Sequence, residues 1–409
     1  MITSSFAEFK QGWKVLLGAI VGVGSGLTGI VFYTHGVFVV PITEEMGWSR
    51  GATLFAFSFV MMSAAITAPF IGIIIDKYGA RRLALFGLFA LGFSFAGLSL
   101  TTDNILTYYA LWIFMALIAA GTFPVTWTRA VNTWFDRRRG LALGLTMMGT
   151  GIAASLGPLF AAKLIDAFGW REAYLTIGAT LLMVSFPIAY VGFRERDAVA
   201  NDVPQTSPKS TDIELRQALA GKTFWVLGFG LLFVCFGVAG LIANLVPLLT
   251  DKGLPRAEAA GYAGLIGINV IIGRLVVGYL IDRFWAPFIA FFFLILPSIS
   301  CILLAVDQPT AVGITIACLL IGLAAGAELD VMAFLISRYF GIKNYGQLYG
   351  GLYVFFAVGS GAAPALFGLW YDIAGNYTTI LYGTAVLFVA GSSMLLLMGP
   401  YPNLEEELI

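Results

Sequence analysis

Long apolar stretches alternate along the chain with short segments rich in charge, proline or glycine, and this pattern predicts membrane-spanning helices. A helix needs about 20 apolar residues to cross a bilayer. The stretches that meet this requirement lie at residues 14–40, 52–75, 83–101, 105–131, 141–166, 172–193, 223–250, 258–281, 286–306, 311–338, 346–371 and 377–399. We therefore expect an all-α membrane protein with twelve transmembrane helices.

The composition supports this expectation and excludes several classes of protein. Of the 409 residues, 59% are hydrophobic and only 11% are charged, whereas about 25% of a soluble domain is charged. Lysine plus arginine and aspartate plus glutamate each number 23, so the chain has no basic excess with which to bind a nucleic acid. Twelve spans and their loops also leave no room for a sizeable soluble domain.

The short loops predict the orientation of the chain in the membrane. If the N-terminus is cytoplasmic, sixteen of the 23 lysines and arginines fall on the cytoplasmic side, and only Arg50, Arg171, Lys252 and Arg256 fall outside. Such an excess of positive charge is typical of cytoplasmic loops. We expect a multi-pass protein of the cell (inner) membrane with both termini in the cytoplasm.

The two halves of the chain look like an internal repeat. Residues 194–222 form the longest hydrophilic segment, which we interpret as a cytoplasmic linker between a six-helix bundle at 1–193 and a second one at 223–409. Adding 206 to a residue number relates Pro41 to Pro247, Gly47 to Gly253, Arg50 to Arg256, Gly72 to Gly278, Asp76 to Asp282, Gly140 to Gly346, Gly144 to Gly350, Pro158 to Pro364, Asp166 to Asp372 and Gly169 to Gly375. Six spans per half make the repeats parallel, and two such bundles can rock about a site between them.

Three charged residues at mid-membrane depth break this repeat. The 206 offset relates Arg274, Glu328 and Asp330 to uncharged residues. A charge at the centre of a bilayer costs about 2.5–3.5 kcal/mol on insertion scales, so such residues usually face a cavity and have a partner. Arg274 is thus either a binding group for an anion or the partner of one of these carboxylates. Lys163 and Asp166, one turn apart near the outer end of the fifth span, are expected to pair locally.

Metal and catalytic chemistry find little support in the sequence. His35 is the only histidine, and Cys235, Cys301 and Cys318 all lie in apolar runs, where a thiol behaves as a small hydrophobic group. No nucleophile with a matching base is evident. We expect no metal, no cofactor and no enzymatic activity.

One motif resembles a signature of transport proteins. The sequence from Gly72 to Arg82 reads Gly-Ile-Ile-Ile-Asp-Lys-Tyr-Gly-Ala-Arg-Arg, with a degenerate copy from Gly278 to Asp282, and it resembles the signature of the major facilitator superfamily. In such a motif the glycine lets a neighbouring helix approach, while the acidic and basic residues form ion pairs that hold one state of a gate. The predicted gating residues are Asp76, Arg81, Arg129, Arg138 and Asp282.

Two further segments are similar to the monocarboxylate transporter family and its bacterial relatives, including the oxalate:formate antiporter group. They are residues 134–144 (Trp-Phe-Asp-Arg-Arg-Arg-Gly-Leu-Ala-Leu-Gly), and residues 36–41 followed by 47–50. The acidic motif expected at the first span is replaced here by Lys-Gln-Gly-Trp-Lys at 10–14, which favours the bacterial branch. The resemblance implies that Arg274 anchors an anionic substrate, as a forked, permanently charged donor suits a carboxylate. The antiporters carry a lysine on the eleventh span, but residues 346–371 contain none, which favours a monocarboxylate.

These observations predict proton-coupled symport of a small monocarboxylate, such as lactate or pyruvate, by alternating access. Substrate bound at Arg274 would draw that arginine away from a nearby carboxylate, which would then take up a proton. The candidate proton acceptors are Asp330 and Glu328, with His35 as an alternative that could instead be a gate or hydrogen-bonding residue. Other candidate binding residues are Tyr33, Asn244 and Asn269, together with the aromatic residues Trp127, Tyr349, Tyr353 and Phe356, all of which could equally be packing residues.

The expected partners are a small carboxylate, a proton and the lipid bilayer, with the protein acting as a monomer and binding no nucleic acid. Exchange or export of a larger carboxylate, including aromatic ones, is an alternative mode of transport. A transporter-like receptor that binds without translocating is the alternative outside transport.

Overall fold

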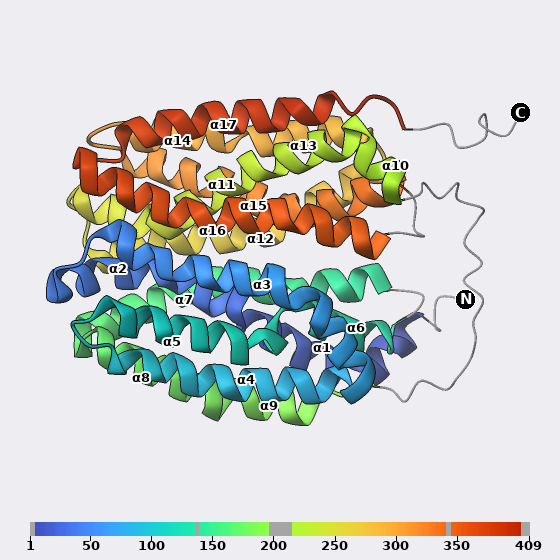
Figure 1. Cartoon of the computed structure of the whole chain (residues 1–409), viewed down its shortest axis with the longest axis horizontal. Coiled ribbons are helices and arrows are strands. Elements are labelled where there is room, and N and C mark those ends of the chain that lie inside the picture. The colour runs from blue at the N-terminus through green and yellow to red at the C-terminus, as the bar shows by residue number, and fades with distance from the viewer. Residues whose placement is uncertain (1–4, 136–138, 196–214, 341–344, 402–409) are drawn as a thin grey trace, which may run out of the picture.

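Figure 1 shows the computed structural model of the chain, which describes residues 5–135, 139–195, 215–340 and 345–401. All regular elements in this described part are helices, and no strand occurs among them. Linker residues 196–214 and Arg138 lie outside the described residues, as does the side chain of Asp76.

The first half of the chain forms six passes, several of which are interrupted. Their elements are α1 (Ser5–Gly24), η1 (Leu27–Val31), α2 (Phe32–Met46), α3 (Arg50–Tyr78), α4 (Ala80–Gly97), η2 (Leu98–Leu100), α5 (Ile105–Ile118), η3 (Ala120–Thr122), α6 (Pro124–Asn132), α7 (Arg139–Phe168), α8 (Trp170–Thr180), η4 (Leu181–Ser185) and α9 (Phe186–Gly192).

The second half is more regular. After the short α10 (Leu215–Ala220) it consists of α11 (Lys222–Asp251), α12 (Arg256–Ile281), α13 (Ala286–Ile295), α14 (Pro297–Ala305), α15 (Ala311–Phe340), α16 (Tyr345–Ala374) and α17 (Thr378–Leu396). In Figure 1 this half lies above the first, and α10, the end of α17 and the start of α1 all lie toward the right. We call that end of the molecule the inner face and the opposite end the outer face, following the predicted orientation.

Eleven described helical segments are long and apolar enough to cross a membrane. The remaining predicted span, 105–131, is divided between α5 and α6, because the 3-10 turn η3 and the following Pro124 interrupt the helix. The predicted all-α fold of twelve membrane passes in two repeats is therefore confirmed. The first span is longer than predicted: it covers Glu8–Met46 and is made of α1, η1 and α2, with a break at Ser25 and Gly26 between α1 and η1.

Residues related by the 206 offset occupy equivalent places in the two halves. Pro41 lies inside α2 and Pro247 inside α11, each in the helix that rises to the outer face. Gly47 and Gly253 follow these helices with φ of 68° and 92°, a left-handed conformation that glycine adopts without strain and that ends a helix. Both halves therefore turn at the outer face in the same way.

The interruptions in the first half meet inside the protein. The backbone N–H of Leu27, in η1, donates to Oγ1 of Thr122, in η3, at 3.2 Å. Ser25 Oγ donates to Ser185 Oγ, in η4, at 2.8 Å. Irregular backbone at membrane depth is tolerated only where protein or a cavity surrounds it, so these bonds place the breaks in the interior of the bundle.

The two halves contact each other along α3 with α16 and α7 with α12, two equivalent pairs that we call the α3/α16 seam and the α7/α12 seam, and also along α2 with α11. In the first, Ser58 Oγ donates to the carbonyl of Gly361 at 2.6 Å. In the second, a Cβ on Gly264 would lie 2.7 Å from the carbonyl oxygen of Ser155. The 206 offset relates Ser58 to Gly264 and Ser155 to Gly361, so small residues at the same repeat positions bring both pairs of helices together.

Candidate functional site

The three charged residues that break the repeat lie on two tightly packed helices of the second half. Arg274 is on α12, and Glu328 and Asp330 are on α15. A Cβ on Gly326 would lie only 2.2 Å from the carbonyl oxygen of Val270, and one on Gly273 would lie 2.5 Å from that of Leu323. These glycines let α12 and α15 approach closely, which brings the arginine and the carboxylates to one site.

Arg274 pairs with Asp330 but keeps unused hydrogen-bond donors. Its Nε lies 3.1 Å from Oδ2 of Asp330, within the distance of an ion pair. The N–H does not point at the carboxylate, however, and neither Nε nor Nη1 makes a hydrogen bond. The arginine side chain is only 9% exposed, against 36% for that of Asp330. A buried guanidinium with free donors is a strong binding group for an anion.

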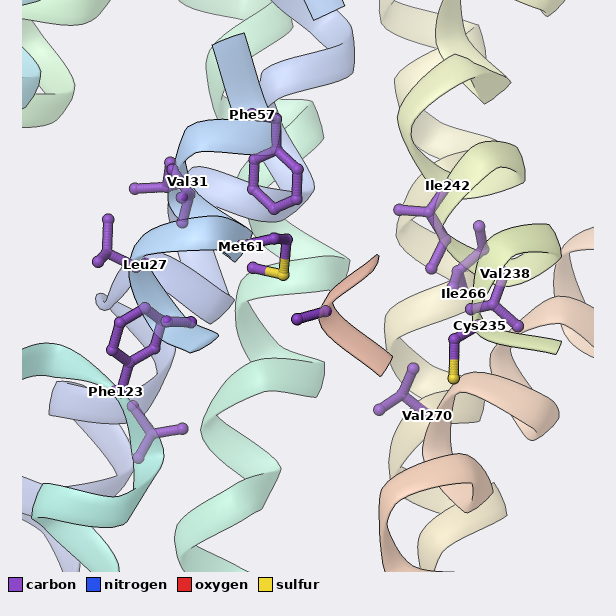
Figure 2. Close-up of a cluster of buried hydrophobic side chains, with 14 of the residues drawn as sticks. Leu27, Val31, Phe57, Met61, Phe123, Cys235, Val238, Ile242, Ile266 and Val270 are labelled. Atoms are coloured by element: carbon purple, nitrogen blue, oxygen red, sulfur yellow. The ribbon is translucent and has the colours of Figure 1, made fainter. Parts of the chain in front are cut away.

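Glu328 is the most buried carboxyl group at this site. The residue is 8% exposed, and its Oε2 has no hydrogen-bond partner. Cys235 of α11 lies beside it. Nothing in the sequence associates this thiol with a charged group, because Cys235 stands in an apolar run and Glu328 is on another helix. Figure 2 shows Cys235 among Val238 and Ile242 of α11 and Ile266 and Val270 of α12.

The first half contributes Tyr33 to the same site. This tyrosine is on α2, just after the interruption η1, and its hydroxyl interacts electrostatically with both Glu328 and Arg274. Tyr353 of α16 lies near Cys235. Of the residues predicted from the sequence, the structure thus brings together Arg274, Glu328, Asp330, Tyr33 and Tyr353.

Aromatic rings extend along α16 from Tyr353. The Tyr349 and Tyr353 rings stack with centroids 6.3 Å apart, and Phe356 follows at 5.2 Å from Tyr353. Trp127 does not join them: it is fully buried within the first half, where it packs on Phe193. A wall of three rings therefore stands on α16 alone.

Asn269, Asn244 and His35 lie in other surroundings. The Asn269 amide donates to the carbonyl of Leu265, in its own helix α12. Asn244 on α11 accepts a hydrogen bond from the hydroxyl of Tyr377, toward the outer face.

His35 packs against aromatic rings, with centroids 4.7 Å from Trp112 and 5.9 Å from Phe57, and neither ring nitrogen has a hydrogen-bond partner. The predicted binding function of Asn269 and Asn244 and the predicted coupling function of His35 stay predictions.

Among the predicted gating residues at the inner face, Arg81 makes contacts within its own half. Arg81 Nη2 donates to the carbonyl of Tyr190 at 2.8 Å, and the Glu195 carboxylate accepts the backbone N–H groups of Ala80 and Arg81. Asp282 is exposed at the end of α12, and Arg129 lies in the last turn of α6.

The hydrogen bonds and ion pairs that join described residues of opposite halves all lie in the outer part of the molecule. They connect α3 with α11, α16 and Tyr377, and α7 with α12. The halves are therefore joined at the outer face.

Known proteins match this chain over most of its length. The model of the Major Facilitator Superfamily matches residues 21–333. The sequence is 25% identical to the uncharacterized MFS-type transporter YcxA of Bacillus subtilis, covering 94% of each chain. It is 24% identical to monocarboxylate transporter 12 of Rattus norvegicus, covering 94% of this chain and 84% of that protein.

A solved structure has the same fold. It is a bacterial homolog to the human lysosomal transporter Spinster in an inward-facing and occupied conformation, with a TM-score of 0.72 at 16% identity. The match covers 95% of this chain and 97% of that one.

Proposed function

Because this chain belongs to the Major Facilitator Superfamily and is a membrane transporter of that superfamily, we propose that it carries a small monocarboxylate, such as lactate or pyruvate, together with a proton. The observation that carries the proposal is Arg274, a buried guanidinium with unused donors between two carboxyl groups and a tyrosine. Relatives named as monocarboxylate transporters support this class of substrate.

The substrate carboxylate binds to the free N–H groups of Arg274. A forked guanidinium can donate to both oxygens of a carboxylate, which fixes the orientation of the substrate as well as its charge. Tyr33 of the other half lies near Arg274 and Glu328, and its hydroxyl is the candidate donor of a further hydrogen bond to the substrate. Because the substrate would contact both halves, substrate binding is linked to the movement of one half relative to the other.

Charge balance provides the reason for proton coupling. Arg274, Asp330 and Glu328 together carry one negative charge when all three are ionised, and a bound monocarboxylate adds a second. Burying this excess charge away from water is costly. A proton taken up with each anion keeps the charge of the site constant, and by reciprocity each favours the binding of the other.

Glu328 is the better candidate for the proton acceptor. Asp330 already lies 3.1 Å from Arg274, so its charge is compensated, and its side chain is 36% exposed, which makes it less buried than Glu328. Glu328 is buried, has an oxygen without a hydrogen-bond partner, and lies beside an uncharged thiol. We propose that the transporter works as a monomer in the cell membrane with both termini in the cytoplasm, as the loop charges indicate.

Uptake into proteoliposomes tests the proposal. Purified protein is reconstituted, and uptake of labelled lactate, pyruvate and longer monocarboxylates is measured with an inward proton gradient, compared with no gradient. Arg274→Gln is expected to abolish uptake. Arg283→Gln is a matched control, because Arg283 is exposed past the end of the same helix and stacks on Tyr279. Normal uptake by Arg274→Gln would contradict the proposal. Absence of monocarboxylate uptake by the parent protein would contradict it as well.

A second candidate function is exchange of a larger aromatic carboxylate. The stacked rings of Tyr349, Tyr353 and Phe356 favour it, since aromatic substrates stack on such a surface. Counterflow in the absence of a pH gradient, with aromatic and aliphatic acids compared, distinguishes exchange from symport. Binding without any uptake or counterflow would instead indicate a receptor.

A further inference from the structure

A cluster of charged residues joins the two halves at the outer face, centred on Arg50 at the start of α3. Its Nη1 and Nη2 donate to both carboxylate oxygens of Asp251, at the end of α11, at 2.5 and 2.7 Å. The guanidinium lies 3.8 Å from the centroid of the Tyr371 ring. Nη1 also donates to the hydroxyl of Tyr377 at 3.2 Å. The arginine of one half is thus held on several sides by the other half.

Asp372 holds the backbone at the same place. Its two carboxylate oxygens accept the N–H groups of Arg50 and Gly51, at 2.9 and 2.8 Å. N–H groups in the first turn of a helix have no partner within that helix, and a carboxylate is favoured beside them. Gly51 makes the approach possible, because a Cβ would lie 2.8 Å from the backbone nitrogen of Leu369.

The α7/α12 seam carries the equivalent contact. Arg256, at the start of α12, donates through Nη1 to Oδ1 of Asp166, near the end of α7, at 2.6 Å. The 206 offset relates Arg50 to Arg256 and Asp166 to Asp372, so the same two repeat positions meet in both seams. The expected local pair of Lys163 with Asp166 gives way to this contact between halves.

The two contacts differ in strength. The Arg50 and Asp251 side chains are 12% and 26% exposed, and Arg50 has three partners, whereas the Arg256 and Asp166 side chains are 23% and 43% exposed and pair with each other. A solvent-exposed ion pair contributes little, while a buried one is costly to break on one side. The Arg256–Asp166 ion pair is therefore the weaker of the two contacts.

We propose that Arg50, with Asp251 and Asp372, and Arg256, with Asp166, form the outer gate of this transporter, and that the α7/α12 contact is the weaker part of this gate. This inference rests on the proposed function only in that it assumes alternating access. Arg50 and Arg256 are repeat equivalents, as are Asp166 and Asp372, and all four contact the opposite half. We therefore assign them to gating and not only to the architecture that the two halves share. Opening requires both arginines to leave their partners, so weakening either one shifts the protein toward the state that is open outside.

Distances between spin labels in substrate-free protein test the gate. In a background with Cys235, Cys301 and Cys318 replaced by alanine, one label pair is placed at Thr102 and Gln308 on the outer face and another at Tyr78 and Phe284 on the inner face. The 206 offset relates the two members of each pair, and all four positions are exposed. The labels report the state without any substrate, so a wrong choice of substrate does not affect the outcome.

The variants are Arg50→Gln, Arg256→Gln and, as a matched control, Arg171→Gln. Arg171 also forms an ion pair at the outer face, but its partner Glu45 belongs to the same half. We expect the ratio of outward-open to outward-closed protein to rise up to about fivefold in Arg256→Gln and at least about tenfold in Arg50→Gln. The outer distance should lengthen and the inner one shorten, and Arg171→Gln should leave both distributions unchanged.

Charge reversal separates gating from a loss of folding. Arg256→Asp alone should open the outer face, and Arg256→Asp combined with Asp166→Arg should restore the parent distances. The proposal is overturned if both gate variants keep the parent distributions, or if Arg171→Gln shifts them equally. Equal shifts in Arg50→Gln and Arg256→Gln would overturn the assignment of the α7/α12 contact as the weaker part of the gate.

Discussion

Nε of Arg274 lies 3.1 Å from Oδ2 of Asp330, yet neither Nε nor Nη1 of this arginine makes a hydrogen bond. The ion pair therefore compensates the charge of Arg274 without using its donors. A substrate carboxylate can add to this arrangement rather than displace it completely. Because the unused donors of Arg274 can make directed hydrogen bonds to a substrate, the shape of the guanidinium group, and not only its charge, should matter for transport.

Replacing Arg274 with lysine keeps the charge but removes the forked donor set. We expect Arg274→Lys to raise KM for the substrate about tenfold to hundredfold, because charge-assisted hydrogen bonds contribute roughly 1.5–3 kcal/mol each. Initial rates of uptake into proteoliposomes, measured over a range of substrate concentrations, give KM. An unchanged KM in Arg274→Lys, with folding confirmed by thermal melting, would show that the guanidinium makes no directed contact with substrate.

Glu328→Gln should separate substrate movement from proton movement. In the parent protein, uptake should rise as external pH falls, because proton binding favours anion binding. Glutamine mimics the protonated acid, so Glu328→Gln should exchange substrate in counterflow but lose the dependence of uptake on an imposed pH gradient. Asp330→Asn is the comparison, since it removes the charge beside Arg274 and should keep the dependence on pH. The assignment fails if Glu328→Gln still couples uptake to the gradient.

The sequence predicted the membrane passes and the charged site because both follow from strong local signals. Apolar length defines a span, and a charge such as Arg274 within a span stands out against it. The interruptions at Leu27–Val31 and Ala120–Thr122 carry weaker signals, since glycine and threonine are also common in unbroken transmembrane helices.

Contacts between distant helices could not be predicted from the sequence. The place of Cys235 beside Glu328 depends on how α11 packs against α15. The repeat offset identified Arg50, Asp166, Arg256 and Asp372 as equivalent positions, but it gave no sign that the arginine of one half meets the aspartate of the other. Three-dimensional packing alone supplies that information.

His35 tests whether a buried imidazole serves packing or proton transfer. Its ring lies against Trp112 and Phe57, and its nitrogens make no hydrogen bond. We expect His35→Phe to fold and to retain proton-coupled uptake, because the phenyl ring can occupy the same aromatic site. His35→Ala leaves a cavity and should lower the stability by about 2–4 kcal/mol, which thermal melting in detergent would detect. Loss of pH-dependent uptake in a stably folded His35→Phe would instead indicate that the imidazole transfers protons.

Gly267 of α12 should control how closely the two halves approach. A Cβ at this position would lie 2.2 Å from the backbone nitrogen of Ser155 and 2.4 Å from the carbonyl oxygen of Gly151, both on α7. Backbone atoms cannot move aside as a flexible side chain can, so Gly267→Ala should force the α7/α12 seam apart. We expect a longer distance between labels at Thr102 and Gln308, and a loss of about 1–3 kcal/mol in stability of the outward-closed state. Gly278→Ala is the matched control, because nothing lies within 4 Å of a Cβ at that position of the same helix. If Gly267→Ala kept the parent distance and melting temperature, close packing at this seam would not be what holds the outer face closed.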